Sequence, residues 1–242
     1  NFFTDPYFGR LLKNTFMISG LTILFGFPAP IILALMINEV KNSAFKRTVQ
    51  TITYMPYFIS MVVLCGLLKT FSMQDGLFSQ IATVFGGKAQ NFLANPNYFR
   101  TIYVLSDIWS GIGWNSIIYL AALSSIDQEQ YEAARVDGAN RFQQMLHITL
   151  PGLVPTIMIL FILRMGNILN VGYEKILLLY NSATYSTADV ISTYTYRLSF
   201  GGSGNPMYSK STAIGLFNTI INVVFLMLTN MISKKATDAG LF

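Results

Sequence analysis

Apolar residues gather in five long runs that shorter polar segments separate. The runs cover residues 11–37, 55–71, 101–123, 152–172 and 212–232. A helix that crosses a bilayer needs about 20 predominantly apolar residues, and each run meets or approaches that length. The pattern predicts an all-α transmembrane protein, a polytopic helical bundle of about five spans that forms a single domain over residues 1–242.

Prolines and polar stretches add detail to this pattern. Pro28 and Pro30 lie well inside the first run, and because each lacks a backbone donor we expect that helix to kink there. A short basic connector is predicted over 41–47, and Pro56 is expected to open the second span. Residues 72–97 and 173–211 are predicted to be polar loops.

Composition and charge support a membrane protein and disfavour a nucleic-acid binder. Hydrophobic residues make up 52% of the chain and charged residues 11%, whereas soluble domains have about 25% charged residues. The formal net charge is +5, but the 16 Lys and Arg residues are scattered, with no basic stripe among aromatic residues. We therefore expect no nucleic acid partner. The single cysteine, Cys65, is predicted to be a small buried residue.

The polar segment between the third and fourth runs has the signals of two short helices. Ser125 or Asp127 can cap a first helix, which Gly138 can end because glycine readily adopts the left-handed conformation. A second short helix is predicted over 140–147. Pro151 then suits the first turn of the fourth span.

This same segment, residues 124–151, carries particular residues at fixed gaps. Glu132-Ala133-Ala134 is followed four residues later by Gly138, and then by Ile148-Thr149-Leu150-Pro151. The order resembles the EAA loop of ABC-importer permeases, E-A-A-x3-G-x9-I-x-L-P, in which every fixed position is filled here. The resemblance implies the type I importer fold, a cytoplasmic position for the loop, and a multi-pass protein of a bacterial-type cell membrane.

The resemblance also implies a role for the loop. In the family it lies in a cleft of an ATPase subunit, and the closure of two such subunits on ATP moves the loop and tilts the attached helices. The residues that would carry this coupling are Glu132, Ala133, Ala134, Arg135, Asp137, Gly138, Ile148, Leu150 and Pro151. The alternative is an ordinary helix-turn-helix connector.

Other function classes lack their sequence signals. The chain has no GxxxxGK[ST] phosphate loop, no HExxH, no GxSxG and no His/Cys cluster for a metal. We expect no catalytic activity and no cofactor in this chain, with ATP and Mg binding to the partner ATPase. A secondary transporter or a channel is the remaining rival, and it would not need a coupling loop.

Further segments resemble sugar permeases within the same family. Residues 12–15 look like the start of the first core span, and residues 166–174, 188–197 and 211–218 are similar to the oligosaccharide and polysaccharide branch. They imply a saccharide delivered by an extracytoplasmic solute-binding protein, and a second, different permease subunit that forms a heterodimer. A non-sugar solute is the alternative. Such permeases usually have six spans, so one N-terminal span is expected to be absent from this chain.

Polar residues inside the predicted spans indicate a path for the solute. The predicted path consists of Asn167, Asn170, Trp114, Asp107, Arg164 and Glu174. The predicted shared helical face consists of Arg164, Asn167, Asn170 and Glu174, which recur at three- and four-residue spacing. In the third run, Asp107 and Trp114 follow the same spacing together with Ser110 and Gly111. Amides and carboxylates can hydrogen-bond sugar hydroxyls, and a Trp ring can stack on a pyranose. Alternatively, these groups pair with one another between helices, for example Arg164 with Asp107 or Glu174, and Trp114 fills the bundle.

Overall fold

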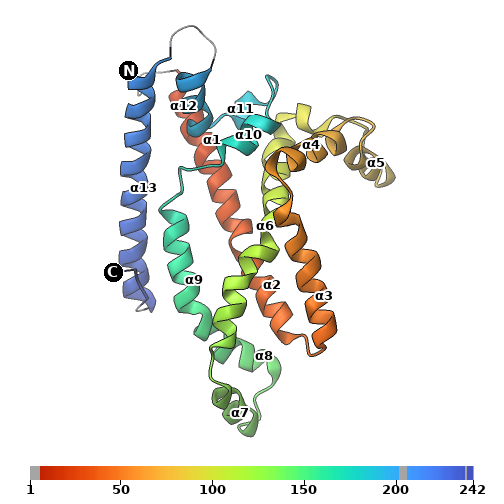
Figure 1. Ribbon diagram of the computed structural model, residues 1–242, viewed down its shortest axis with the longest axis vertical. Helices are drawn as coiled ribbons and strands as arrows, with labels where there is room; N and C mark the ends of the chain where they lie inside the picture. The colour runs from red at the N-terminus through yellow and green to blue at the C-terminus, as the bar shows by residue number, and fades with distance from the viewer. Residues whose placement is uncertain (1–5, 202–205, 238, 242) are drawn as a thin grey trace.

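The computed structural model describes residues 6–201, 206–237 and 239–241 (Figure 1). The first half contains α1 (Phe8–Leu21), the π turn η2 (Thr22–Gly26), α2 (Pro28–Glu39), α3 (Ser43–Tyr54), the 3₁₀ turn η3 (Met55–Phe58), α4 (Met61–Ser72), α5 (Leu77–Val84), the 3₁₀ turn η4 (Phe92–Ala94) and α6 (Pro96–Ser124). The second half contains α7 (Gln128–Val136), α8 (Arg141–Gln144), the π turn η5 (Met145–Thr149), α9 (Leu150–Met165), α10 (Tyr173–Leu179), α11 (Tyr185–Ala188), α12 (Ile191–Phe200) and α13 (Tyr208–Thr237). These ranges contain no strand, which confirms the predicted all-α class.

Within the described residues, four helical segments are long and apolar enough to cross a membrane. They are Phe8–Glu39, Met61–Val84, Arg141–Met165 and Tyr208–Thr237. The third predicted span corresponds to α6, whose 29 residues extend about 43 Å and therefore exceed the bilayer core of about 30 Å. Helix α6 is long enough but is not among the four segments that are apolar enough to cross a membrane. The expected number of about five spans thus corresponds to four apolar segments and one more polar helix.

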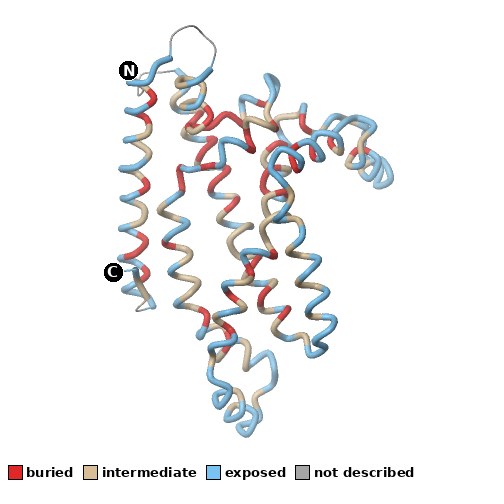
Figure 2. The backbone as a smooth tube through the Cα atoms, in the orientation of Figure 1, coloured by how far each residue is buried: buried red, intermediate tan, exposed pale blue. Residues whose placement is uncertain are grey.

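Helix α6 runs through the middle of the bundle and contacts α2, α3, α9 and α11 (Figure 1). Its Gly113 permits close packing with α3, because a Cβ at this position would collide with the carbonyl oxygen of Thr53. Buried positions follow the inward faces of the helices and gather at the upper end, whereas the segment that contains α7 is largely exposed (Figure 2).

The first span has an irregular turn directly before the prolines that were expected to kink it. The turn η2 has the wider π geometry, in which the N–H of Phe27 donates to the carbonyl of Thr22 at 3.1 Å. A proline ring clashes with the carbonyl four residues earlier, and a π turn accommodates such a clash. The helix then resumes with Pro28 at the start of α2.

The second span begins later than predicted, at Met61. Helix α3 begins at Ser43 and includes Lys46 and Arg47, which were assigned to a connector. Pro56 lies in η3 rather than at the start of a span. The chain then breaks at Ile59, whose backbone is extended, and the side chain of Ser60 caps α4. Hydropathy alone could not locate this break, because the apolar run continues through it.

The two segments predicted to be loops are partly helical. Residues 72–97 include α5 and η4, and residues 173–211 include α10, α11 and α12. Buried apolar positions such as Ile176, Leu179 and Ile191 anchor the second group. The outward faces of α10, α11 and α12 carry polar residues. These polar residues are the reason that the segment was predicted to be a loop.

An ion pair with a buried aspartate connects helices at the upper end of the bundle. Arg197 donates to both oxygens of Asp189, at 2.8 and 2.7 Å, and the Asp189 side chain is 3% exposed. Asn14 donates to the backbone carbonyl of Asp189 at 2.9 Å and accepts from Arg100 at 2.8 Å. Burial by itself would lower the pKa of Arg197, but its hydrogen bonds to Asp189 and Tyr180 outweigh burial and raise that pKa. The cluster joins α1, α6 and α12.

We predict that Asp189→Asn lowers the free energy of unfolding by about 2–3 kcal/mol, because it leaves a half-buried guanidinium without its counter-charge. Arg141→Gln is the matched control, since Arg141 pairs with Glu39 at 3.6 Å on an exposed surface, and it should cost less than about 1 kcal/mol. Thermal unfolding of the purified protein measures both changes. Equal effects of the two substitutions would contradict the assigned role of the buried pair.

Candidate substrate path and coupling loop

The fourth span ends earlier than predicted. Helix α9 stops at Met165, and residues 166–172, here called the unwound segment, form turns and extended backbone before α10 begins at Tyr173. Arg164 lies in the last turn of α9, Asn167 and Asn170 lie in the unwound segment, and Glu174 lies in α10. The prediction that these four residues share one helical face is wrong, because no continuous helix connects them.

Side chains from three other helices pair with the backbone of the unwound segment. The pairs are Ser19 Oγ with the carbonyl of Ile168, the N–H of Leu169 with Asn222 Oδ1 at 3.1 Å, and Ser192 Oγ with the carbonyl of Val171 at 2.9 Å. The three side chains belong to α1, α13 and α12, respectively. They provide the partners that a helix would otherwise supply, so the chain can leave helical geometry inside the bundle.

Buried and exposed positions alternate irregularly along the unwound segment. Ile168, Leu169 and Val171 are buried, whereas Asn167 and Asn170 are exposed. The apolar side chains anchor the backbone and the two amides point away from the core. Asn170 Nδ2 donates to Asn167 Oδ1 at 3.1 Å, so the two amides act as a pair.

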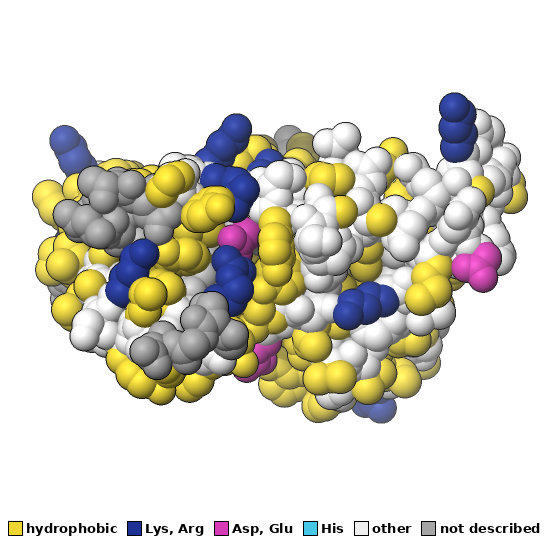
Figure 3. Space-filling model, turned by 90° about the horizontal axis from the view of Figure 1, so that it is seen from above, with side chains coloured by type: hydrophobic (Ala, Val, Ile, Leu, Met, Phe, Trp, Pro, Cys, Tyr) yellow, Lys and Arg dark blue, Asp and Glu magenta, His cyan; other side chains and the backbone are white. Residues whose placement is uncertain are grey.

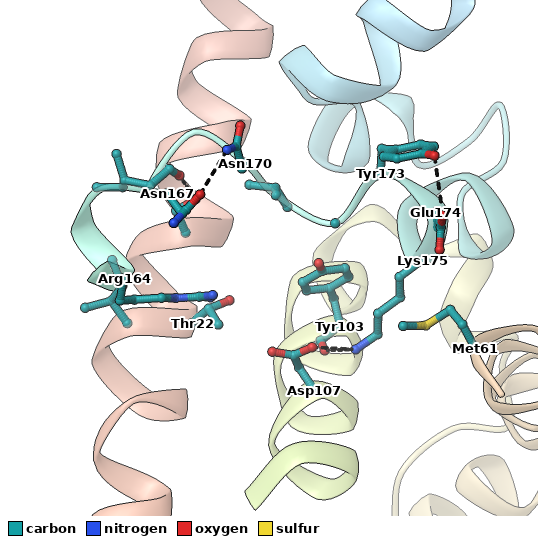
Figure 4. Close-up of a pocket in the computed structure, with 15 residues that line it drawn as sticks. Thr22, Met61, Tyr103, Asp107, Arg164, Asn167, Asn170, Tyr173, Glu174 and Lys175 are labelled. Atoms are coloured by element: carbon teal, nitrogen blue, oxygen red, sulfur yellow. Dashed lines mark hydrogen bonds and ion pairs between the residues drawn. The ribbon is translucent and has the colours of Figure 1, made fainter. Parts of the chain in front are cut away.

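A cavity of about 330 Å³, here called the upper cavity, lies beside the two amides (Figure 4). Five of the six predicted path residues line it, namely Asp107, Arg164, Asn167, Asn170 and Glu174. A second hollow of about 390 Å³, the lower cavity, adjoins it and shares Thr22, Asp107, Arg164 and Asn167. Groups from α6, α9, α10 and η2 therefore meet around two adjoining cavities, which together form a partly polar space.

Trp114 does not belong to this polar space. Its ring stacks on Tyr57 at 4.6 Å between centroids with an interplanar angle of 5°, and it meets Phe58 edge-on. Close packing of α3 on α6 at Gly113 brings these rings together. The next residue, Asn115, lines the lower cavity instead. In this structure Trp114 belongs to a partly exposed aromatic cluster with Tyr57 and Phe58 rather than to the lining of either cavity.

The carboxylate of Asp107 is paired, but with a residue that the sequence did not single out. Lys175 Nζ lies 3.3 Å from Asp107 Oδ1 and donates to the carbonyl of Tyr103 at 3.0 Å. The Lys175 side chain is 2% exposed, whereas that of Asp107 is 42% exposed toward the cavity. Lys175 lies near the start of a segment that was predicted to be a loop, so no local pattern indicated that it is buried.

Two other charged side chains line the upper cavity. Arg164 extends from the end of α9 beside Thr22, while Glu174 lies on the α10 side and accepts a hydrogen bond from Tyr173 at 3.4 Å (Figure 4). Neither the Arg164–Asp107 pair nor the Arg164–Glu174 pair is present among the described residues. The cavity thus presents charges of opposite sign on different walls.

The predicted coupling loop extends below the bundle (Figure 1). Asp127 caps α7 by accepting from the N–H of Glu129 at 3.0 Å, and Gly138 follows the helix with φ +79°. These features confirm the predicted first short helix and its glycine stop. Glu132 and Ala133 are exposed on α7, and Val136 is 88% exposed.

The second short helix is not the separate unit that was predicted. Asn140 and Gln143 form a reciprocal capping box at the start of α8, which continues through η5 into α9. Pro151 lies in the first turn of α9, as predicted. Tyr131 of α7 also hydrogen-bonds Thr149 of η5 at 2.9 Å. The second part of the loop is therefore continuous in helix with α9, and α9 leads to Arg164.

A bundle of membrane-spanning helices around a polar cavity, with an exposed helical loop at one end, defines a membrane transport subunit. The match to known proteins is specific. Residues 26–238 match the family of the binding-protein-dependent transport system inner membrane component. The chain belongs to this family and is a multi-pass inner-membrane permease of an ABC importer.

Individual relatives cover nearly the whole chain. Protein LplB of Bacillus subtilis (strain 168) is 43% identical over 100% of this chain and 76% of its own length. The polygalacturonan/rhamnogalacturonan transport system permease protein YteP of the same strain is 41% identical over 99% of this chain and 74% of its own length. A chain of a bacterial alginate ABC transporter, crystallised with an alginate pentasaccharide-bound periplasmic protein, superposes with a TM-score of 0.93. It is 48% identical and covers 99% of this chain and 82% of its own.

We predict that Asn170→Ala reduces solute uptake more than it reduces assembly, because its exposed amide faces the cavity. Asn222→Ala is the contrasting variant. Asn222 is buried and pairs with the N–H of Leu169, so its loss should lower thermal stability and yield. Uptake normalised to assembled protein separates the two effects. An Asn170→Ala protein with full uptake would argue against a cavity-lining role in transport.

Proposed function

We propose that the chain forms one half of the path through which an ATP-driven importer moves an oligosaccharide or polysaccharide. The observation that carries this proposal is the upper cavity, where amide, carboxylate and guanidinium groups face one space inside a membrane-spanning bundle. Polar groups in a span often serve a substrate path. Here the Asn167–Asn170 amide pair and Arg164 are exposed and line the cavity.

The names of the relatives support a saccharide. Besides YteP, a relative of 29% identity is the arabinooligosaccharides transport system permease protein AraP, and the structural neighbour belongs to an alginate transporter. Their shared substrate chemistry is a chain of sugars. The upper and lower cavities could accept one or two sugar rings at a time, with the remainder of the chain following.

The proposal includes four kinds of partner. A second, different permease would complete the path as a heterodimer, two ATPase subunits would supply the energy, and an extracytoplasmic solute-binding protein would deliver the saccharide. ATP and Mg would bind the ATPase subunits and no cofactor would bind this chain. The alginate transporter was crystallised in complex with a periplasmic protein that holds a pentasaccharide, and this complex supports the delivery step.

Coupling to the ATPase is assigned to the loop of residues 124–151. Support comes from its exposed apolar side chains, since Val136 and Phe142 are 88% and 66% exposed on a part of the chain that protrudes from the bundle. Its continuity with α9 supports the transmission of motion to the cavity. Glu132, Ala133 and Gly138 are the residues through which an ATPase surface would approach.

We predict that Gly138→Val abolishes transport or ATPase association while leaving membrane insertion normal. Gly138 has φ +79°, which a β-branched residue resists, so the turn between α7 and α8 would change direction. Co-purification of the ATPase and ATP-driven uptake are the measurements.

Gly86→Val provides a matched control for backbone strain. Gly86 has φ +81°, it lies in the segment that joins α5 to η4, and neither glycine has a neighbouring atom within 4 Å of an added Cβ. The strain is therefore similar, but the site is far from the loop. If both variants lose ATPase co-purification or uptake to the same extent, the specific role proposed for Gly138 is contradicted.

We also predict that the isolated polypeptide neither binds nor hydrolyses ATP, because its sequence has no phosphate loop. Hydrolysis should appear only when the ATPase subunits are added. Turnover by this chain alone, with contaminating ATPases removed, would refute the division of labour proposed above.

A further inference from the structure

Building on the proposed saccharide path, we infer that the transported saccharide carries carboxylate groups and that Arg164 selects for them. The substrate class would be a uronate-containing oligosaccharide or polysaccharide. Arg164 would be a specificity-determining residue that contacts the carboxylate during passage.

Arg164 lies at the boundary between the two cavities. It lies in the last turn of α9, is exposed, and lines both the upper and the lower cavity. The side chain extends into the space between α9 and α6, beside Thr22 (Figure 4). A solute in either cavity would therefore lie next to residues that include Arg164.

Arg164 forms no ion pair with the carboxylates that line the cavity. Among the described residues, no carboxylate oxygen lies within 4.0 Å of its guanidinium group. Asp107 shares the cavity, but Lys175 lies 3.3 Å from it and neutralises it. An arginine in a membrane-spanning bundle without a counter-charge is costly, so such residues face water or a ligand and mark substrate pathways.

The groups around Arg164 match a sugar acid in geometry. A guanidinium presents a planar fork of donors that matches a carboxylate, and its hydrogen bonds to the charged carboxylate are stronger than those to neutral sugar hydroxyls. Asn167 lies three residues further along, and its Oδ1 already accepts from Asn170 while its Nδ2 donates to the carbonyl of Leu163 at 3.1 Å. These bonds hold the amide pair in place beside the guanidinium. The resulting wall is suited to a uronate ring, with the carboxylate on Arg164 and hydroxyls on the amides.

Glu174, on another wall of the cavity, should oppose the charge preference of Arg164. It is exposed and carries no cation partner among the described residues. A carboxylate on the substrate would be repelled there, so Glu174 and Arg164 should shift charge selection in opposite senses. The end face above the cavities also displays more basic than acidic side chains (Figure 3), which favours the approach of a polyanion.

The test uses the complete assembly, reconstituted in vesicles with its ATPases, partner permease and binding protein. The probes are tetramers of galacturonate and of mannuronate, each compared with its methyl ester, which has the same shape without the charge. The measured quantity is the ratio of acid uptake to ester uptake. Because every variant uses the same binding protein, the preference of that protein cancels when ratios are compared between variants.

We expect Arg164→Gln to lower the ratio about tenfold, the loss typical of a charge-assisted hydrogen bond. Arg164→Lys should retain part of the ratio, and Glu174→Gln should raise it. Lys88→Gln, which removes an exposed cation from the segment after α5, should leave it unchanged. If Arg164→Gln fails to assemble, the opposite shifts in Arg164→Lys and Glu174→Gln still decide the matter.

The experiment distinguishes a failure of the proposed saccharide function from a failure of the inference about carboxylates. If the unmodified assembly imports neither acidic nor neutral tetramers, maltotetraose included, the proposed saccharide function fails. If it imports saccharides but prefers the esters, or if the ratio is the same in the Arg164 and Glu174 variants as in the unmodified protein, the inference about carboxylates is overturned while the saccharide function stands.

Discussion

The structure depends on one constraint, which is that a backbone leaving helical geometry inside a membrane must find other partners for its polar groups. An unpaired N–H or carbonyl in hydrocarbon costs several kcal/mol. The unwound segment of residues 166–172 meets this requirement through Ser19, Asn222 and Ser192, which come from three different helices. The bundle is therefore arranged around this segment as much as around its apolar core.

The functional features follow from that arrangement. Once α9 ends at Met165, the amides of Asn167 and Asn170 no longer follow a helical face and can project into the cavity. The second part of the coupling loop is also continuous in helix with α9. A displacement of the loop would move the end of α9, and with it Arg164, relative to α6. One helix thus connects the proposed site of ATPase contact to the proposed substrate path.

The sequence predicted the parts of the fold that depend on local signals. The all-α class, the helix capped by Asp127 and its stop at Gly138 were correct, because capping residues and glycine act within one turn. Signals that depend on distant partners were missed. The end of α9 depends on Asn222, 53 residues away from Leu169, and the burial of Lys175 depends on Asp107, 68 residues away. Trp114 had the right spacing for the path, but Tyr57 and Phe58 hold it elsewhere.

The accessibility of the unwound segment in the assembled importer would test this arrangement most directly. A cysteine placed at Asn170 would be labelled with a membrane-impermeant maleimide with and without saccharide, and the native Cys65, which is 1% exposed, should contribute little background. We expect position 170 to react and the transported saccharide to slow the reaction. A cysteine there that never reacts, or one that reacts at the same rate with and without saccharide, would contradict the placement of the substrate path at this segment.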